Sequence, residues 1–252
     1  MARKLNRIGE SNISNEGCLM TIIESDGDRH IWVQFEDEYR YIVHTQYKHF
    51  KSGSVSNPYH KSVYGIGVRG VGEYTNFTSN DIRYREWSGM LRRCYSKEYL
   101  SKKPSYKGCE VCEEWKNYQN FAKWFDLNYY EIEGERMCLD KDILVKHNKI
   151  YSPDNCIIVP NCINCLFTKS NKSRGKYPIG VNSRNGKTFY AVSSNGKKQN
   201  IRLGSFNNIE DAFTAYKMYR ENIIKNIADE YKDLIPQRLY EALYKYTIEI
   251  TD

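Results

Sequence analysis

The chain has 252 residues and a formal net charge of +7, and its 40% hydrophobic content is enough for a folded core. No run of about 18 apolar residues occurs and the N-terminal residues lack an apolar segment, so neither a membrane-spanning helix nor a signal peptide is expected. The eight cysteines then predict a cytoplasmic protein, with reduced thiols or with cysteine metal ligands.

Residues 1–79 are expected to form a small β domain. Three stretches, MTIIES, IWVQFED and RYIVHTQY, alternate in polarity and are rich in β-branched or aromatic residues, which is typical of strands. The DGD sequence at 26–28 is a hairpin turn signal. Three roles stay open for this segment: it binds DNA, it binds a host protein partner, or it only packs.

Residues 80–170 begin with two predicted helices, RYREWSGMLRRCY (83–95) and CEEWKNYQNFAKWF (112–125). Apolar side chains recur in both at helical spacing. The first set is Tyr84, Trp87, Leu91 and Cys94, and the second is Trp115, Tyr118, Ala122 and Phe125. These stripes are more typical of a core than of a ligand site, and we expect the two helices to support the stretch that follows them.

That stretch, LDKDILVKHNKIYSPDNCIIVPNCIN, covers residues 139–164. Its order is a short acidic strand, a turn-rich loop, a second apolar strand and the start of a helix. In an extended strand Asp140 and Asp142 lie on the same face, because side chains two apart point to the same side. The plain interpretation of this acidic pair is a solvated strand end, with Lys141 as a local partner.

Residues 171–252 are expected to form three strands and a long helix. The strands KYPIGVNSR, TFYAVSS and QNIRLGSF are separated by Asn-Gly pairs at 185–186 and 195–196, a strong hairpin signal. The helix is expected over 207–231, with Asn208 as N-cap and with Glu210 and Asp211 in its first turn. The residues expected to pack on the sheet are Ala212, Ala215, Tyr216, Tyr219 and Ile223. Pro236 ends the run.

The fold class expected from these segments is α+β, with domains at 1–79, 80–170 and 171–252. Residues 155–209 contain no Asp or Glu but carry nine basic side chains. They are Lys169, Lys172, Arg174, Lys176, Arg184, Lys187, Lys197, Lys198 and Arg202. An uncompensated basic segment predicts a polyanion partner, and the alternative is a merely solvated basic face.

The 139–164 stretch resembles the motif of HNH endonucleases of the phage homing type. The third segment resembles the plant-type APETALA/ethylene-response DNA-binding domain, which such nucleases often carry. The resemblance spans about residues 84–230 and implies a central ββα-metal unit, a DNA-reading sheet, and a phage-encoded protein in the cytoplasm of a bacterial host cell.

The resemblance also implies roles for individual residues. Asp140 matches the metal-binding Asp, Asn155 the Asn that braces the hairpin, and Asn164 the helix ligand. The ion would be Mg²⁺ or Mn²⁺, which prefer oxygen donors. The position of the catalytic histidine holds Lys141, which should stay protonated at neutral pH beside two carboxylates and is therefore a poor general base. Asp142, His147 or the substrate phosphate could replace the base, so all three stay open.

The cysteines allow a second metal. Cys109 and Cys112 form one C-x-x-C pair and Cys162 and Cys165 another, a pattern typical of a four-thiolate Zn²⁺ site. The second pair straddles Asn164, out of step with the zinc cysteines of HNH nucleases. Reduced thiols are therefore the favoured interpretation. The remaining cysteines are expected in the core: Cys18, Cys94, Cys138 and Cys156.

The DNA-reading face follows from the resemblance and from strand alternation. It would carry Asn182 and Arg184 on the first strand, Tyr190 on the second, and Asn200 and Arg202 on the third. Lys187, Lys197 and Lys198 lie at hairpin tips, where phosphate contacts are expected. The linker that would follow the DNA backbone carries Lys169, Lys172, Arg174 and Lys176.

The leading expectation is a metal-dependent DNA endonuclease or nickase of the phage HNH homing type. One alternative is a catalytically inactive DNA-binding protein on the same frame, acting as a regulator or in phage–host conflict. The other is a protein-binding module that acts on a host defence complex. Asp140, Lys141 and Asn164 discriminate the first two, whereas the third predicts a tight protein partner.

Overall fold

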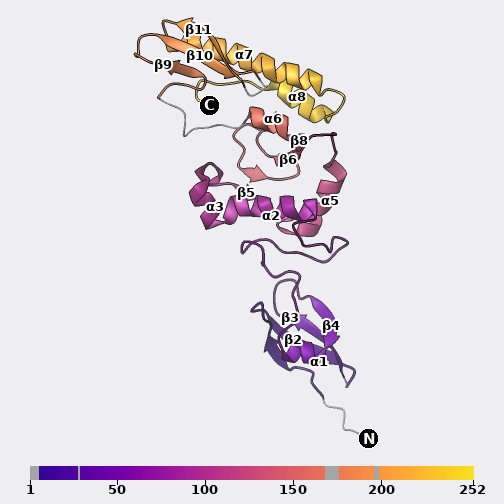
Figure 1. Cartoon of the computed structure of the whole chain (residues 1–252). Helices are drawn as coiled ribbons and strands as arrows, with labels where there is room; N and C mark the ends of the chain where they lie inside the picture. Colours follow the sequence, from indigo (N-terminus) through magenta and orange to yellow (C-terminus); the bar gives the residue numbers. More distant parts are fainter. Residues whose placement is uncertain (1–5, 28, 168–175, 196–198) are drawn as a thin grey trace. The chain divides into compact units, whose positions relative to one another are not determined.

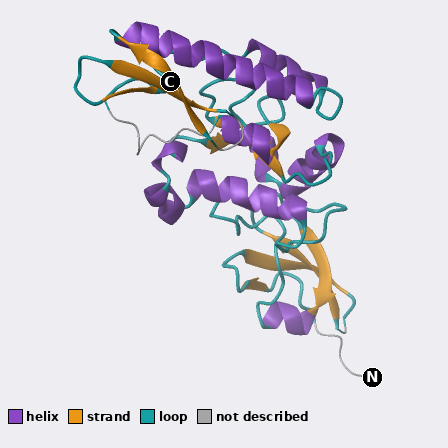
Figure 2. Cartoon of the chain, turned by 45° about the horizontal axis from the view of Figure 1, so that its top comes forward, coloured by secondary structure: helices purple, strands orange, loops and turns teal. Residues whose placement is uncertain are grey.

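The computed structural model describes residues 6–27, 29–167, 176–195 and 199–252. The chain folds into two compact units, Met1–Leu127 and Asn128–Asp252. Both units combine helices with small sheets, so the expected α+β class is confirmed (Figures 1 and 2). This division does not test the domain boundaries predicted after residues 79 and 170.

The first unit begins with a four-stranded antiparallel sheet whose neighbouring strands pair in chain order. Its strands are β1 (Ser11–Ile13), β2 (Leu19–Ser25), β3 (His30–Phe35) and β4 (Ile42–Gln46), and α1 (Tyr47–Lys51) follows. The three strands predicted from alternation are confirmed. One face of the sheet is buried in an apolar core: Met20, Ile22, Ile31, Val33, Phe35, Phe50 and Val55. The intervening side chains of β3 are partly exposed.

The rest of the first unit is mainly helical. Its elements are α2 (Ile82–Tyr95), α3 (Lys97–Lys102), η1 (Pro104–Tyr106), β5 (Glu110–Val111), α4 (Glu113–Lys116) and α5 (Tyr118–Asn128). The predicted aromatic stripes are core. Their buried members are Trp87, Leu91, Cys94, Trp115, Tyr118, Ala122 and Phe125. Only Tyr84 is partly exposed.

The single helix expected over 112–125 is wrong in one respect, because it is interrupted at Asn117. The backbone of Asn117 is extended, with φ −90° and ψ 122°. Val68 pairs with this position: its N–H donates to the Lys116 carbonyl and its carbonyl accepts from the Tyr118 N–H, both at 2.9 Å. The backbone of Val68 thus pairs with the Lys116 carbonyl and the Tyr118 N–H, two groups that a continuous helix would use for its own hydrogen bonds.

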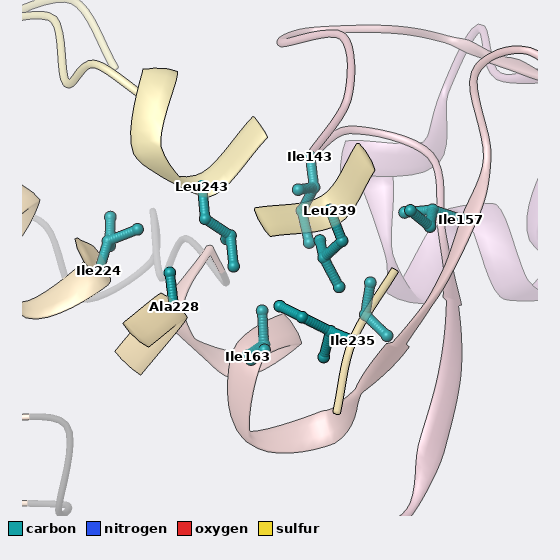
Figure 3. Close-up of a cluster of buried hydrophobic side chains, with 9 residues drawn as sticks. Ile143, Ile157, Ile163, Ile224, Ala228, Ile235, Leu239 and Leu243 are labelled. Carbon is teal, nitrogen blue, oxygen red and sulfur yellow. The ribbon is translucent and has the colours of Figure 1, made fainter. Parts of the chain in front are cut away.

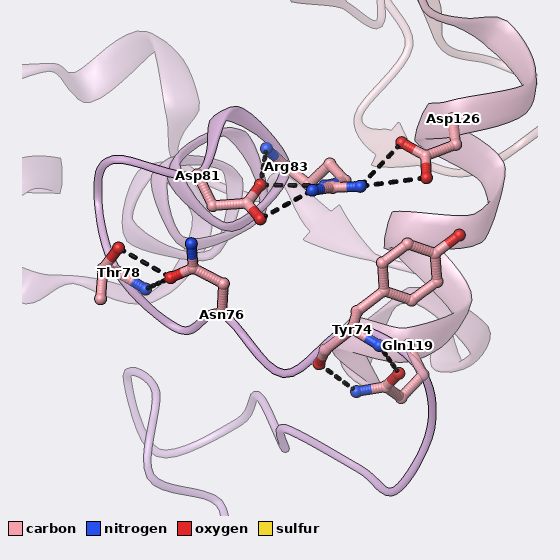
Figure 4. Close-up of polar contacts among 7 residues, drawn as sticks. All are labelled: Tyr74, Asn76, Thr78, Asp81, Arg83, Gln119 and Asp126. Carbon is pink, nitrogen blue, oxygen red and sulfur yellow. Dashed lines mark hydrogen bonds and ion pairs between the residues drawn. The ribbon is translucent and has the colours of Figure 1, made fainter.

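A polar network fixes the start of α2 (Figure 4). Asp81 is the N-cap, and its Oδ1 accepts from the Arg83 N–H at 2.9 Å. The Arg83 guanidinium lies between two carboxylates, 2.9 Å from Asp81 Oδ2 and 3.1 Å from Asp126 Oδ2 on α5. Gln119 on α5 holds the incoming chain through the backbone N–H and carbonyl of Tyr74. These contacts tie the loop before α2 to α5.

The second unit contains the hairpin predicted at 139–164. β6 (Met137–Asp140) pairs antiparallel with β8 (Ile157–Pro160), and Asp140 lies opposite Ile157. β7 (Ile150–Tyr151) lies in the connection, and α6 (Asn161–Leu166) follows β8 directly. The predicted order of strand, loop, strand and helix is confirmed, and all four residues of β8 are buried.

The three-stranded sheet is also confirmed. β9 (Val181–Ser183), β10 (Phe189–Ser194) and β11 (Asn200–Phe206) are antiparallel with β10 in the centre. α7 (Ile209–Glu230) packs on this sheet, and the side chain of Asn208 caps it by accepting from the Asp211 N–H at 2.7 Å. Of the residues expected to face the sheet, Ala212 and Tyr216 are buried and the other three are partly exposed.

A short helix that the sequence did not predict, α8 (Gln237–Lys245), begins after Pro236 and packs against α7. Its leucines join the hairpin, α6 and the second half of α7 in one apolar core (Figure 3). The members are Ile143, Ile157, Val159, Ile163, Ile224, Ala228, Ile235, Leu239 and Leu243. The chain on both sides of the boundary predicted after residue 170 therefore contributes to a single core.

Candidate functional site

Asp140 organises the loop that leaves β6. Its Oδ1 accepts from the backbone N–H of Asp142 at 2.7 Å and of Ile143 at 2.8 Å, which turns the chain sharply at the strand end. Oδ2 makes no hydrogen bond within the described part of the chain. Burial raises the pKa of the Asp140 carboxyl, against the two backbone N–H donors, which lower it. A partly buried carboxylate with one oxygen that has no hydrogen bond among the described residues can accept a cation.

Lys141, at the position of the family's histidine, is buried inside this loop. Its Nζ donates to Asp142 Oδ1 at 2.6 Å and to the Asn148 carbonyl at 2.7 Å. The ammonium group also lies 5.8 Å from the centroid of the Tyr151 ring. All of these partners belong to the hairpin connection, so Lys141 holds the loop together and does not point a free amine toward solvent.

Asn148 is the residue that sequence reasoning missed in this loop. Its Nδ2 donates to the carbonyls of Lys141 at 2.8 Å and Ile150 at 2.7 Å, which closes the loop. Its Oδ1 accepts from Asn155 Nδ2 at 3.3 Å. Asn155, predicted to brace the hairpin, thus contacts the loop through Asn148. The available signal was an asparagine between two strands, where its side chain can replace backbone turn hydrogen bonds.

His147 lies at the outer edge of the same loop. Its backbone is left-handed, with φ 62°, and its side chain is 65% exposed. Nε2 is 3.4 Å from Oδ1 of Asp252, whose Oδ2 accepts from Lys146 Nζ at 2.6 Å. The last residue of the chain therefore contacts the loop that holds one of the candidate bases, a contact that the sequence did not predict.

Asn164 lies on α6, which packs against β6 and β8. Its neighbour Ile163 is buried in the core that contains Ile143 and Ile157, so Asp140 and Asn164 belong to elements of one core. One carboxylate oxygen and one amide oxygen are donors that fit a hard divalent cation, with water and phosphate completing its coordination. In the described part of the chain, no group of three or more His, Cys, Asp or Glu side chains is placed to hold a metal ion. The pair of Asp140 and Asn164 contributes only one such side chain, Asp140, and so is not a group of this kind.

The two C-x-x-C pairs fall in different units, Cys109 and Cys112 in the first and Cys162 and Cys165 in the second. Cys162 Sγ donates to Tyr231 Oη at 3.2 Å, and that hydroxyl donates to Glu135 Oε1 at 2.9 Å. Burial raises the pKa of the Cys112 and Cys162 thiols, which opposes the thiolate form that zinc requires.

All eight cysteines lie in the described part of the chain, and none of them forms a disulfide. Cys94 and Cys156 are buried, whereas Cys18 and Cys138, also expected in the core, are partly exposed.

The three-stranded sheet has one face covered by α7 and one open face. On β10, Phe189 and Ala191 are buried in the core shared with α7, so Tyr190 points to the other side. Tyr190 lies opposite Asn182 on β9. On β11, Arg202 lies opposite Val192 and Asn200 opposite Ser194, which places both on the open face. Four of the five residues predicted for this face are thus brought together.

A bulge on β11 shapes the centre of this face. The pairing changes from Ala191–Gly204 to Val192–Arg202, which leaves Leu203 as an extra residue. Arg202 and Ser205 consequently share the open face, and the guanidinium donates to Ser205 Oγ at 2.8 Å. The Arg202 Cζ lies 4.7 Å from the centroid of the Tyr190 ring. Ser205 was not foreseen, because regular alternation would have turned it toward the helix.

The remaining predicted DNA contacts are placed less centrally. Arg184 lies past the end of β9, in the exposed turn that also carries Lys187. The side chain of Asn185 holds this turn by accepting from the N–H groups of Lys187 and Thr188. Lys176 is exposed. The others lie outside the described residues: Lys169, Lys172, Arg174, Lys197 and Lys198.

Neither a family model, nor a curated protein, nor a solved structure matches this chain. In the described ranges, no helix is both long enough and apolar enough to cross a membrane.

Proposed function

We propose that this chain is a metal-dependent DNA endonuclease or nickase of the HNH homing type, which holds double-stranded DNA with the open face of β9–β11. The observation that carries the proposal is Asp140. Its half-buried carboxylate ends the first strand of a β6–β8–α6 unit and keeps Oδ2 free of hydrogen bonds within the described residues. On this proposal the protein is phage-encoded and acts in the cytoplasm of a bacterial host cell.

The open face supports the DNA-binding part. A two- or three-stranded ribbon fits the major groove, where arginine reads guanine and asparagine reads adenine. Arg202 is held over Tyr190 and by Ser205, so less side-chain entropy is lost when it binds a base. Asn182 and Asn200 extend the polar surface on the two outer strands. Lys187, at the exposed hairpin tip, would contact a phosphate.

The hairpin supports the catalytic part. A divalent cation held by Asp140 and Asn164 would neutralise charge on the cleaved phosphate. The base must come from elsewhere than Lys141, because its ammonium group is already bonded to Asp142 and the Asn148 carbonyl. His147 is exposed and has a carboxylate partner in Asp252, which would orient the ring. We therefore assign His147 as the base, with Asp142 as the alternative.

A second candidate is a DNA-binding protein that does not cleave. The same burial of Lys141 favours it, because the position of the family's base is filled by a residue that stabilises the loop. Such a protein would still bind DNA with the open face of β9–β11 but would not cleave it.

Supercoiled-plasmid nicking with Mg²⁺ or Mn²⁺ separates the two candidates. We expect nicking that EDTA abolishes and that Asp140→Ala lowers about 100-fold or more, because a metal ion supplies several kcal/mol of charge stabilisation. His147→Ala should lower nicking while plasmid binding is retained. Arg202→Ala is the matched control, because it should weaken DNA binding without changing the rate at saturating protein. Salt-dependent DNA binding without nicking would overturn the enzyme and leave the second candidate.

A further inference from the structure

The open face of the first unit's sheet carries a row of three adjacent aromatic rings. Trp32 on β3 lies directly opposite His44 on β4, with ring centroids 4.5 Å apart and the rings tilted by 31°. His44 stacks on His30, at 5.3 Å and an interplanar angle of 27°. All three side chains alternate with the buried residues of their strands, so they lie on the face away from the core. His44 is exposed and the other two are partly exposed.

A basic cleft adjoins the His30 end of this row. It has a volume of about 430 Å³ and is lined by Arg7, Arg29, Gln46, Tyr47 and Lys48. Gln46 lies opposite His30, so the cleft and the rings belong to one continuous surface. The Arg7 Cζ lies 3.7 Å from the centroid of the Tyr47 ring, and Tyr47 Oη donates to Glu10 Oε2 at 2.9 Å. The cleft is thus lined by three cationic side chains, Arg7, Arg29 and Lys48.

We propose that this surface binds single-stranded nucleic acid, with a phosphate in the basic cleft and unpaired bases stacked on Trp32 and His44. Aromatic rings and neighbouring cations are the two features that bind a single strand without strong sequence preference. Double-stranded DNA does not suit the ring row, because its bases are already stacked on one another. The site is separate from the DNA face proposed on β9–β11.

The charges along the sheet give the bound strand an orientation. Glu24 on β2 lies opposite Trp32 on the same face, so phosphates are disfavoured near the middle of the sheet. The cations gather at the end where β3 begins and β4 runs into α1. At the far end of the face, Leu19 and Ile42 are exposed aliphatic residues. A protein partner would use that end, whereas a nucleic acid would use the rings and the cleft.

The test measures binding of fluorescein-labelled oligothymidylate and oligouridylate to the full chain by fluorescence anisotropy. Every protein carries Arg202→Ala, so that failure of the face on β9–β11 and failure of this site are distinguishable. Trp32→Ala should weaken binding about fivefold or more, and Trp32→Phe should largely restore it, because stacking needs a ring and not an indole. Both oligomers should show these losses, because stacking and phosphate contacts do not depend on the 2′-hydroxyl.

Two matched pairs of variants control for charge and for folding. Lys48→Ala should weaken binding about threefold or more and lower its salt dependence, whereas Lys51→Ala, on the same helix α1 but outside the cleft, should not. Leu19→Ala, at the far end of the same face, should leave the affinity unchanged. The proposal is overturned if the Arg202→Ala parent protein binds the oligomers as tightly as it does with Trp32→Ala or Lys48→Ala added. A protein partner would then be the remaining candidate for this face.

Discussion

At the scale of single residues, Asp140 would have to be ionised to bind a metal ion, although ionisation of this carboxyl costs stability. Its carboxylate is partly buried, and this desolvation raises its pKa above the ordinary value. A raised carboxyl pKa means that the folded state binds the proton more tightly than the unfolded state, so stability falls as pH rises from the ordinary pKa through the raised one. At neutral pH the ionised group therefore lowers the stability of the metal-free protein.

Replacing Asp140 with asparagine should remove this cost. The amide oxygen can still accept from the N–H groups of Asp142 and Ile143 while carrying no charge. We expect D140N to raise Tm at neutral pH without metal and to abolish both nicking and any rise in Tm on adding Mg²⁺. Differential scanning calorimetry with and without Mg²⁺ measures this. D142N is the control and should lower Tm, because Asp142 pairs with the buried Lys141. A lower Tm for D140N in the absence of metal would contradict the interpretation.

The residues of the open face were predictable because alternation is a local property. Once the resemblance indicates which strands present the face, alternation places Asn182, Tyr190 and Arg202 on the same side of the sheet. Asn148 and Asp252 were not predictable in this way. Asn148 acts through the closure of an irregular loop, and Asp252 meets Lys146 across 106 residues of sequence. Contacts of this kind depend on packing that the period of a strand or helix does not report.

At the scale of elements, Gly180 couples the start of β9 to α7. It has φ +77°, and an added Cβ would lie 2.1 Å from Cδ2 of Tyr216. Gly186, in the turn between β9 and β10, also has a positive φ of +72°, but its nearest neighbouring atom would be 3.9 Å away. The two glycines therefore share the backbone constraint and differ in the space around them.

Alanine substitutions at these two glycines should separate the two effects. G186A should lower the free energy of unfolding by about 1–2 kcal/mol, the cost of a left-handed non-glycine residue. G180A should cost more, by about 1–3 kcal/mol beyond G186A, because Tyr216 must move within the core. Urea denaturation followed by far-UV circular dichroism measures both. Equal losses would mean that Tyr216 moves aside freely.

The element boundaries show where periodicity fails. The pattern over 112–125 is helical at nearly every apolar position, yet the helix breaks at Asn117 because Val68 pairs with the backbone there. No element was predicted after Pro236, although Leu239 and Leu243 have the i, i+4 spacing of a helix face and both are buried. A short segment has too few periodic positions to show from its sequence whether it is helical. Its packing in the core then determines whether the helix forms.

At the scale of the whole molecule, the second unit depends on one core that joins segments distant in the sequence. Leu239 on α8 is fully buried in the cluster that contains Ile143, Ile157 and Ile163 of the hairpin and α6 (Figure 3). L239A should lower the free energy of unfolding by about 2–5 kcal/mol, the usual cost of a cavity left by a buried leucine. L234A is the matched control, because Leu234 is 54% exposed and should change stability by about 0.5 kcal/mol or less.

Hydrogen exchange followed by mass spectrometry distinguishes a shared core from a local one. If the hairpin and α8 unfold together, L239A should lower protection in peptides from β6 and β8 as much as in peptides from α8, although Leu239 belongs to neither strand. The position of Asp140 then depends on the C-terminal helices, and L239A should also lower nicking at temperatures where the wild-type protein is fully folded. Loss of protection confined to α8 would contradict this dependence, because it would show that the hairpin keeps its structure without Leu239.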